Sequence, residues 1–250
     1  MRFKLYSMKR IGLLTVIILT SLFQVAVSQN VLDKKNYDKK EENKKNQDNS
    51  VEVFRDRMVI DVFQSFWLGM PASVNSMKFN PGFSTSILWD IKRAPKSPIS
   101  FGIGGGILYH SQNSDALLKY NSTTGKTMYN VLSLTDSIDI CRTNMWSLYV
   151  PLEFRYRHHN GFKFTLGIRL GYIVGLSQRY KGLDVTGRNQ ETDYTEYQIF
   201  NKMDYNFDVY ARIGWKGLGL FYSYQVTSLF KEGLGPKISP MTVGISISPF

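Results

Sequence analysis

The chain has 250 residues, a formal net charge of +11 at pH 7 and a single cysteine, Cys141. One cysteine excludes an internal disulfide. The positive excess is spread along strands and loops rather than gathered on a basic helix, so we expect no nucleic-acid binding. The 15 Tyr, 16 Phe and 20 Gly are instead typical of an all-β chain with aromatic belts.

The chain begins with the pattern of a secretory signal. A basic stretch from Arg2 to Arg10 precedes an apolar run from Ile11 to Phe23, which is shorter than the ~20 residues of a membrane-spanning helix. Ala26-Val27-Ser28 then supplies small residues at the cleavage positions. We therefore expect residues 1–28 to be a signal peptide that is cleaved before Gln29.

The next segment is polar. Residues 31–50 consist mainly of Lys, Asn, Asp and Glu and offer almost nothing to bury. Such a composition does not offset the entropy lost on ordering. We expect residues 29–54 to be a disordered periplasmic segment, and residues 55–250 to form the folded domain.

From Arg57 onward, eight segments alternate apolar and polar side chains with a period of two. The clearest pair is 147–157 and 162–172, joined by a tight turn that contains Asn160-Gly161, a strong hairpin signal. A period of two indicates strands with two unlike faces. The eight predicted strands are 58–66, 83–92, 101–110, 147–157, 162–172, 204–214, 220–226 and 241–250.

The connections between these strands alternate in length. Three are short: 93–98, 158–161 and 215–217. Four are long: 69–80, 111–145, 176–202 and 228–239, with a turn predicted at 121–125 inside the second. Short periplasmic turns, long outer loops and aromatics at the strand ends are typical of outer-membrane barrels, and a soluble sandwich has no reason to segregate its loops in this way.

We therefore predict an all-β fold: an eight-stranded antiparallel up-and-down transmembrane β-barrel in the outer membrane, surrounded by lipid. The final strand ends at Phe250, and terminal aromatics are the usual recognition signal of such barrels. This topology places both termini in the periplasm. An eight-stranded barrel is just filled by its own side chains. Because unpaired ions there would be costly, we expect a paired-charge network without an open pore. Its members, by the period of two, are Glu153, Arg155, Lys163, Arg169, Asp204, Asp208 and Arg212.

Two patches resemble the PorT-like outer-membrane β-barrel family. They read Leu148-Tyr149-Val150-Pro151-Leu152-Glu153-Phe154-Arg155-Tyr156 and Leu166-Gly167-Ile168-Arg169-Leu170-Gly171-Tyr172, and the strand from Met241 to Phe250 is similar to the family's ending. Glu153 and Arg155 are more polar than the family's usual residues there. The resemblance implies an eight-stranded OmpA-like barrel domain. Most members have no known activity, and the one that gives the family its name belongs to type IX protein secretion.

Catalytic residues are not evident. His110, Ser111 and Asp115 are the residue types of a lipid acyltransferase site, but they are also ordinary loop composition. We assign no catalytic, cofactor-binding or metal-binding residue. We expect a structural or interaction role, as an accessory to protein secretion or a surface assembly. Its envelope or secretion partners would contact loops 111–145 and 176–202 or the periplasmic segment. The alternative is a small-solute or lipid-related barrel, acting in transport or lipid modification.

Overall fold

The computed structural model describes residues 58–76, 79–92, 97–132, 138–183 and 190–248. The predicted signal peptide and the segment 29–54 lie outside these residues. No helix in the described ranges is long and apolar enough to cross a membrane, a finding that does not bear on crossing by strands.

The described residues form eleven strands. They are β1 (Met58–Leu68), β2 (Pro81–Lys92), β3 (Ile99–Asn113), β4 (Ala116–Asn121), β5 (Lys126–Val131), β6 (Ile138–Arg157), β7 (Phe162–Leu183), β8 (Glu191–Glu196), β9 (Tyr205–Trp215), β10 (Leu218–Gln225) and β11 (Ser239–Ile247).

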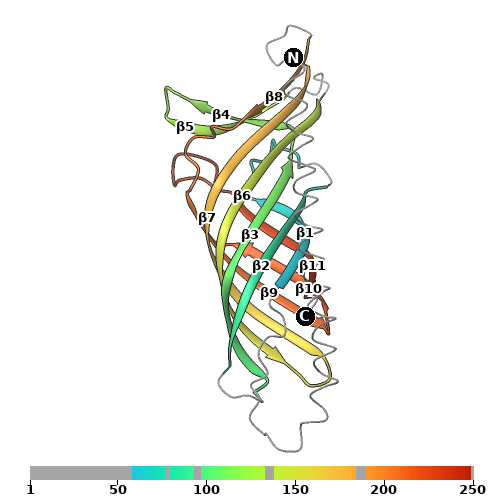
Figure 1. The fold of residues 1–250 in the computed structure, drawn as a ribbon. Coiled ribbons are helices and arrows are strands. Elements are labelled where there is room, and N and C mark those ends of the chain that lie inside the picture. The colour runs from blue at the N-terminus through green and yellow to red at the C-terminus, as the bar shows by residue number, and fades with distance from the viewer. Residues whose placement is uncertain (1–57, 77–78, 93–96, 133–137, 184–189, 249–250) are drawn as a thin grey trace, which may run out of the picture. The chain divides into compact units, whose positions relative to one another are not determined.

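Eight of these strands close into a barrel (Figure 1). Their order around the wall is β6-β3-β2-β1-β11-β10-β9-β7, and β7 pairs again with β6. All of these pairings are antiparallel. The predicted fold class, a closed eight-stranded antiparallel barrel, is confirmed.

The longest hairpin joins β6 to β7. Its tight turn is held by Gly161 N–H, which donates to His158 O at 3.0 Å, and by Phe162 N–H, which donates to Asn160 Oδ1 at 3.0 Å. Gly161 has φ of 99°, a conformation that a side chain disfavours, which explains the glycine of the Asn-Gly signal. We call the end of the barrel that carries this turn the short-turn end, and the opposite end the long-loop end.

At the long-loop end, two of the four long connections, 111–145 and 176–202, contain more strand than the sequence predicts. The expected hairpin within 111–145 is present as β4 and β5, with a turn at 122–125. The segment 176–202, predicted as a polar loop, instead begins with the last eight residues of β7 and contains β8, which pairs with β7. The loop prediction fails there because alternation continues past Gly175, with Leu176, Gln178 and Tyr180 buried on one face.

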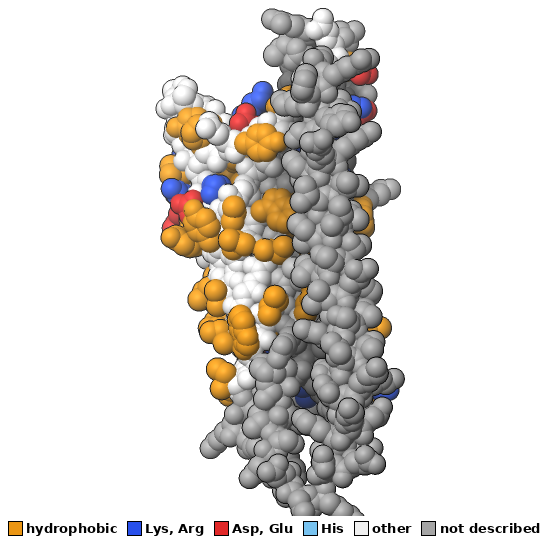
Figure 2. Space-filling view, viewed as in Figure 1, with side chains coloured by type: hydrophobic (Ala, Val, Ile, Leu, Met, Phe, Trp, Pro, Cys, Tyr) orange, Lys and Arg blue, Asp and Glu red, His pale blue; other side chains and the backbone are white. Residues whose placement is uncertain are grey.

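Burial alternates along the barrel strands as it does in a membrane barrel, with apolar side chains facing outward and polar side chains facing inward. On β6 the outward side chains of Leu148 and Val150 are 53% and 46% exposed, while the inward Tyr149 and Glu153 are 4% and 3% exposed. The apolar face is therefore outside and the polar face inside. In Figure 2, hydrophobic side chains cover the visible wall of the barrel, and charged side chains gather toward the long-loop end.

Aromatic side chains mark both edges of this apolar wall. Near the long-loop end, Tyr109 and Trp146 pack with ring centroids 4.6 Å apart, and Tyr172 packs against Tyr205 at 5.6 Å. Near the short-turn end, Phe101 packs against Phe154 at 5.7 Å. Two aromatic belts that bound an apolar band are typical of a barrel that spans a bilayer.

Candidate functional site

The lumen contains a chain of alternating acidic and basic side chains, which we call the ion chain. Its members come from four strands, β1, β2, β6 and β9. In order, the ion chain runs Asp61, Arg212, Glu153, Arg155, Asp90 and Arg157.

Arg212 joins the first two carboxylates: its Nε and Nη2 donate to Asp61 at 2.9 and 2.7 Å, and its Nη1 donates to Glu153 Oε1 at 2.7 Å. Arg155 extends the ion chain: its Nε donates to Glu153 Oε2 and its Nη1 donates to Asp90 Oδ1, each at 2.5 Å.

Neutral side chains complete the hydrogen bonding of these buried carboxylates. The Tyr210 hydroxyl donates to Glu153 Oε1 at 2.6 Å, and the Ser84 hydroxyl donates to Asp61 Oδ2 at 2.7 Å. Three acids and three bases balance, which is the condition under which buried ions are tolerated. The ion chain occupies the part of the lumen nearer the short-turn end.

Of the seven predicted lumen residues, five lie in the lumen and two lie at its ends. Glu153, Arg155 and Arg212 belong to the ion chain, and Arg169 and Asp208 are buried in the lumen beside each other on β7 and β9. The other two, Lys163 and Asp204, lie at the ends of the barrel wall.

Lys163 is half-buried near the short-turn end, with its Nζ 3.4 Å from Ser248 Oγ. Asp204 does not lie in the lumen: it precedes β9, is exposed and pairs with Lys202 at 3.2 Å. The period of two fails for Asp204 because the strand begins only at Tyr205.

The predicted network omits three members of the ion chain: Asp61, Asp90 and Arg157. Asp61 and Asp90 lie on the polar faces of the first two predicted strands, so the period of two could have identified them as lumen residues. Their partners could not be read from spacing, because Asp61 and Arg212 are 151 positions apart and meet only through closure of the barrel.

Arg169 occupies the middle of the lumen and is fully buried. Its guanidinium carbon lies 4.5 Å from the ring centroid of Tyr210, 5.0 Å from that of Phe221 and 5.1 Å from that of Tyr149. Its three side-chain nitrogens have no hydrogen-bond partner among the described residues. Arg169 is therefore held by cation–π contacts with three rings, and Asp208 is its neighbour in the β7–β9 register.

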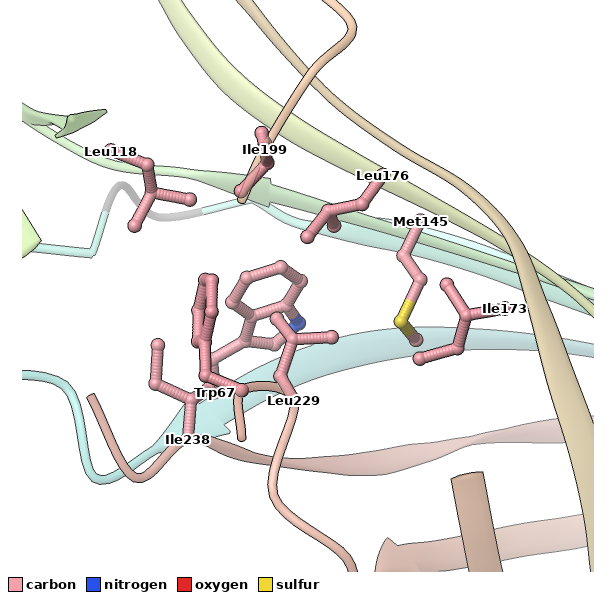
Figure 3. Packing of buried hydrophobic residues seen from close by; sticks show 9 residues of the cluster. Trp67, Leu118, Met145, Ile173, Leu176, Ile199, Leu229 and Ile238 are labelled. Carbon is pink, nitrogen blue, oxygen red and sulfur yellow. The ribbon is translucent and has the colours of Figure 1, made fainter. Parts of the chain in front are cut away.

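A cluster of apolar side chains, which we call the apolar cap, lies at the long-loop end of the lumen (Figure 3). In Figure 3, Trp67, Leu229 and Ile238 face Leu118, Ile199 and Leu176 across the barrel. Strands and loops that are distant in the sequence thus meet over the lumen. The complete cluster is Trp67, Leu118, Met145, Ile173, Leu176, Ile199, Leu229, Phe230 and Ile238.

Beyond the apolar cap, β4, β5, β8 and residues 197–202 form a surface that we call the outer platform. The β4–β5 hairpin is fixed to neighbouring loops, because Asn201 Nδ2 donates to Gly125 O at 2.9 Å and Thr127 N–H donates to Leu234 O at 2.8 Å. Several aromatic side chains remain exposed on this platform. They are Tyr120 (44%), Tyr194 (40%), Tyr197 (76%) and Phe200 (51%).

Two exposed ion pairs lie at the long-loop end, on β6, β7 and β8. Arg179 forms a two-pronged ion pair with Asp193, with N–O distances of 3.2 and 3.0 Å, and Lys181 contacts Asp139 at 2.8 Å. The hydrogen bond from Arg179 lowers the pKa of Asp193. Because these pairs are exposed, we expect little stability from them.

Cys141 lies in β6 and is buried, whereas the sequence suggested a loop. Its thiol donates to Ala116 O at 3.3 Å, and burial raises the pKa of the thiol to about 11. A thiol with a raised pKa is a poor nucleophile at neutral pH. The position is that of a small buried side chain between β6 and β4.

The residues considered for acyl transfer are held apart by other contacts. His110 Nδ1 lies 3.1 Å from Ser65 Oγ, inside the lumen. Asp115 instead accepts hydrogen bonds from the backbone and side-chain nitrogens of Asn75, both at 2.8 Å. The carboxylate that would orient the histidine is therefore engaged elsewhere.

Together, the closed ring of eight strands, the outward apolar band, the aromatic belts and the polar lumen define an integral outer-membrane β-barrel. Sequence comparison agrees, because the family model of the outer membrane protein beta-barrel domain matches residues 58–231. This chain belongs to that family, and its location is the outer membrane.

A comparison with curated protein sequences finds no match. Among solved structures, two of Ail, the attachment invasion locus protein of Yersinia pestis, are similar to this chain. One, in complex with the heparin analogue sucrose octasulfate, is 10% identical with a TM-score of 0.33, and the other is 11% identical with a TM-score of 0.37. Each alignment covers 76% of this chain and 95% of the Ail chain, and we base no conclusion on so distant a likeness.

Proposed function

We propose that this outer-membrane barrel has a structural or interaction role and binds partner proteins through its outer platform. The observation that carries the proposal is the filled lumen, which holds the ion chain, Arg169 and the apolar cap at three successive levels. A barrel of eight strands has an interior that its own side chains can fill. A lumen packed in this way favours the binding of partner proteins at the ends of the barrel over the passage of solutes through it.

The outer platform supports this role. Short turns of outer-membrane barrels lie in the periplasm and long loops at the cell surface, so the outer platform faces outward. It presents Tyr120, Tyr197 and Phe200 to solvent, and exposed aromatics are the residue type that dominates protein interfaces. Loops 111–145 and 176–202 supply most of its residues. The other proposed contact region, the periplasmic segment, lies outside the described residues.

The finer proposal is an accessory role in protein secretion of the type IX kind. It is supported by the resemblance of residues 148–156 and 166–172 to the PorT-like family. The proposal includes no catalytic role, because His110 and Asp115 are held by Ser65 and Asn75.

The test is a mild-detergent pull-down of the tagged barrel from outer membranes, followed by mass spectrometry. We expect envelope or secretion proteins at near-equal amounts. The variant Tyr120→Ser/Tyr197→Ser/Phe200→Ser should lose them, while His159→Ser in the turn at the opposite end should retain them. Heat-modifiable gel mobility shows whether each variant is folded.

The same preparation tests the alternative function, a small-solute or lipid-related barrel. A barrel that purifies alone and shows steady single-channel conductance in a planar bilayer would contradict the interaction role and favour a small-solute function. A barrel that purifies alone without conductance would direct attention to the lipid-related function.

A further inference from the structure

A groove lies at the long-loop end between β5 and the loop that precedes β11. Its volume is about 470 Å³, within the range of roughly 300–1,000 Å³ that is usual for binding pockets. Residues 126–129 of β5 form one wall, and Gly233, Gly235 and Pro236 of the loop form the other, with Pro71 beside them. Two glycines in the loop wall leave space for another chain to approach β5.

The strand β5 presents one edge of its backbone to this groove. Its other edge pairs with β4 (Figure 1). Thr127 N–H donates away from β4, to Leu234 O in the opposite wall, at 2.8 Å. Because backbone groups alternate between the two edges of a strand, Tyr129 and Val131 also direct their N–H and C=O groups away from β4. Among the described residues, none forms a hydrogen bond with these groups of Tyr129 and Val131.

The two walls of the groove are tied together. Asn201 Nδ2 donates to Gly125 O, at the start of β5, at 2.9 Å and to Leu234 O in the loop at 3.2 Å. The loop is also anchored at both ends, because Phe230 and Ile238 belong to the apolar cap. The groove is therefore formed in advance, and a preformed site loses less entropy when it binds a ligand.

The groove is bordered mainly by positive charge. Lys126 lies in the β5 wall, Lys231 and Lys237 flank the loop wall, and Glu232 is the acid of that loop. All four side chains are exposed, and none of the four is ion-paired within the described ranges. Three cations against one acid favour a ligand with acidic side chains.

We propose that this groove binds an extended acidic segment of a partner protein, which adds to β5 as a third strand of the β4–β5 sheet. An open strand edge is a template for another chain. In strand addition, backbone hydrogen bonds supply affinity and alternate side chains enter the adjoining groove. The inference rests on the partner-binding role of the outer platform and adds the chemistry of the partner to it.

The first measurement is affinity selection on the folded, full-length barrel in an uncharged detergent. An acidic pool of octapeptides alternates Asp or Glu with Val, Ile, Thr or Tyr, and a basic pool carries Lys or Arg in place of the acids. We expect mass spectrometry to find saturable retention of acidic peptides alone. The proposal is overturned if the acidic pool is retained no better than the basic pool.

The second measurement tests the backbone of the ligand on the unmodified protein. The acidic peptide that is retained best is labelled with fluorescein, and its affinity is measured by fluorescence anisotropy. Two further versions are N-methylated at alternate residues, one at the odd positions and one at the even. Since a strand offers only one edge to β5, one version should lose binding at least about tenfold and the other should retain it. Equal binding of both versions would contradict strand addition, because a site that reads side chains alone treats them alike.

The third measurement locates the site with matched variants. Val131→Pro removes an outward N–H and should weaken peptide binding on the order of tenfold, whereas Val131→Ala keeps this donor and should change it less than about threefold. Lys126→Glu reverses a charge in the groove wall and should weaken binding about fivefold. Lys216→Glu makes the same change of net charge in the turn at the opposite end of the barrel, and should have less than about twofold effect. Heat-modifiable gel mobility shows whether each variant is folded.

The outcomes separate this inference from the partner-binding role on which it rests. If envelope proteins co-purify equally with the wild type and with folded Val131→Pro, partner binding stands and strand addition at β5 is overturned. If the wild-type barrel purifies alone but binds the acidic peptide in only one N-methylated version, strand addition stands and the role with envelope partners is overturned.

Discussion

Arg212 and Asp61 are 151 positions apart in the sequence and form a two-pronged ion pair in the lumen, with N–O distances of 2.9 and 2.7 Å. The pair connects β9 to β1, which are not neighbours in the barrel wall. Arg212 also holds Glu153 on β6. One guanidinium thus joins three strands across the lumen, and the barrel interior is specified by contacts that no single hairpin contains.

Replacing Arg212 by Met tests this connection. The change leaves Asp61 and Glu153 buried without their main partner, and loss of one member of a buried ion pair costs about 3–5 kcal/mol. We expect the free energy of unfolding to fall by that amount in urea titrations followed by tryptophan fluorescence. Arg179→Met, which removes an exposed pair with Asp193, should cost at most about 1 kcal/mol. Equal losses in the two variants would mean that the lumen pair is no more important than a surface pair.

A second prediction concerns Arg169 and Asp208. Either Arg169→Met or Asp208→Asn leaves the other charge buried and unbalanced, so each single change should cost about 3 kcal/mol. The double variant removes both charges and should be destabilised by less than the sum of the two. A double-mutant cycle on the same unfolding free energies measures this coupling. Strictly additive effects would show that the charges of Arg169 and Asp208 do not interact energetically.

The sequence predicts the barrel well because its strands have two strongly unlike faces. Along β6, apolar outward residues such as Leu148 alternate with polar inward residues such as Glu153, and Asn160-Gly161 marks the turn. The same period of two gives no partner for a lumen charge, since partners such as Asp61 and Arg212 depend on how the ring closes.

The outer platform is less predictable for a different physical reason. The strand β8 reads ETDYTE, and it has no buried face to create alternation: its six residues are exposed or half-buried. The start of β9 shows the opposite error, because the predicted strand includes Asp204 and the observed strand begins only at Tyr205. Local pattern therefore identifies strands that border lipid, and tertiary pairing determines those that do not.

A third prediction concerns Gly167 on β7. The ring of Tyr210 fills the space that a side chain at this position would need. A Cβ at Gly167 would lie 2.5 Å from Cζ and 2.7 Å from the hydroxyl of Tyr210, which donates to Glu153. Gly167→Ala should displace this ring, weaken the hydrogen bond and lower the unfolding free energy by about 1–3 kcal/mol. Gly105→Ala, where a Cβ meets nothing within 4 Å, is the matched control and should stay within about 0.5 kcal/mol of the wild type.

The last prediction concerns the accessibility of Cys141. Burial raises the pKa of its thiol to about 11, so about one thiol in a thousand is ionised at pH 8, and the side chain is also shielded from solvent. We expect the folded barrel to react with iodoacetamide at Cys141 far more slowly than the urea-unfolded chain, as measured by the mass of the modified peptide. A cysteine introduced by Ser122→Cys in the exposed β4–β5 turn provides the internal reference and should be labelled rapidly in the same sample. Similar labelling rates at positions 141 and 122 in the folded protein would mean that β6 opens at Cys141, and that this part of the strand is not packed against β4 in solution.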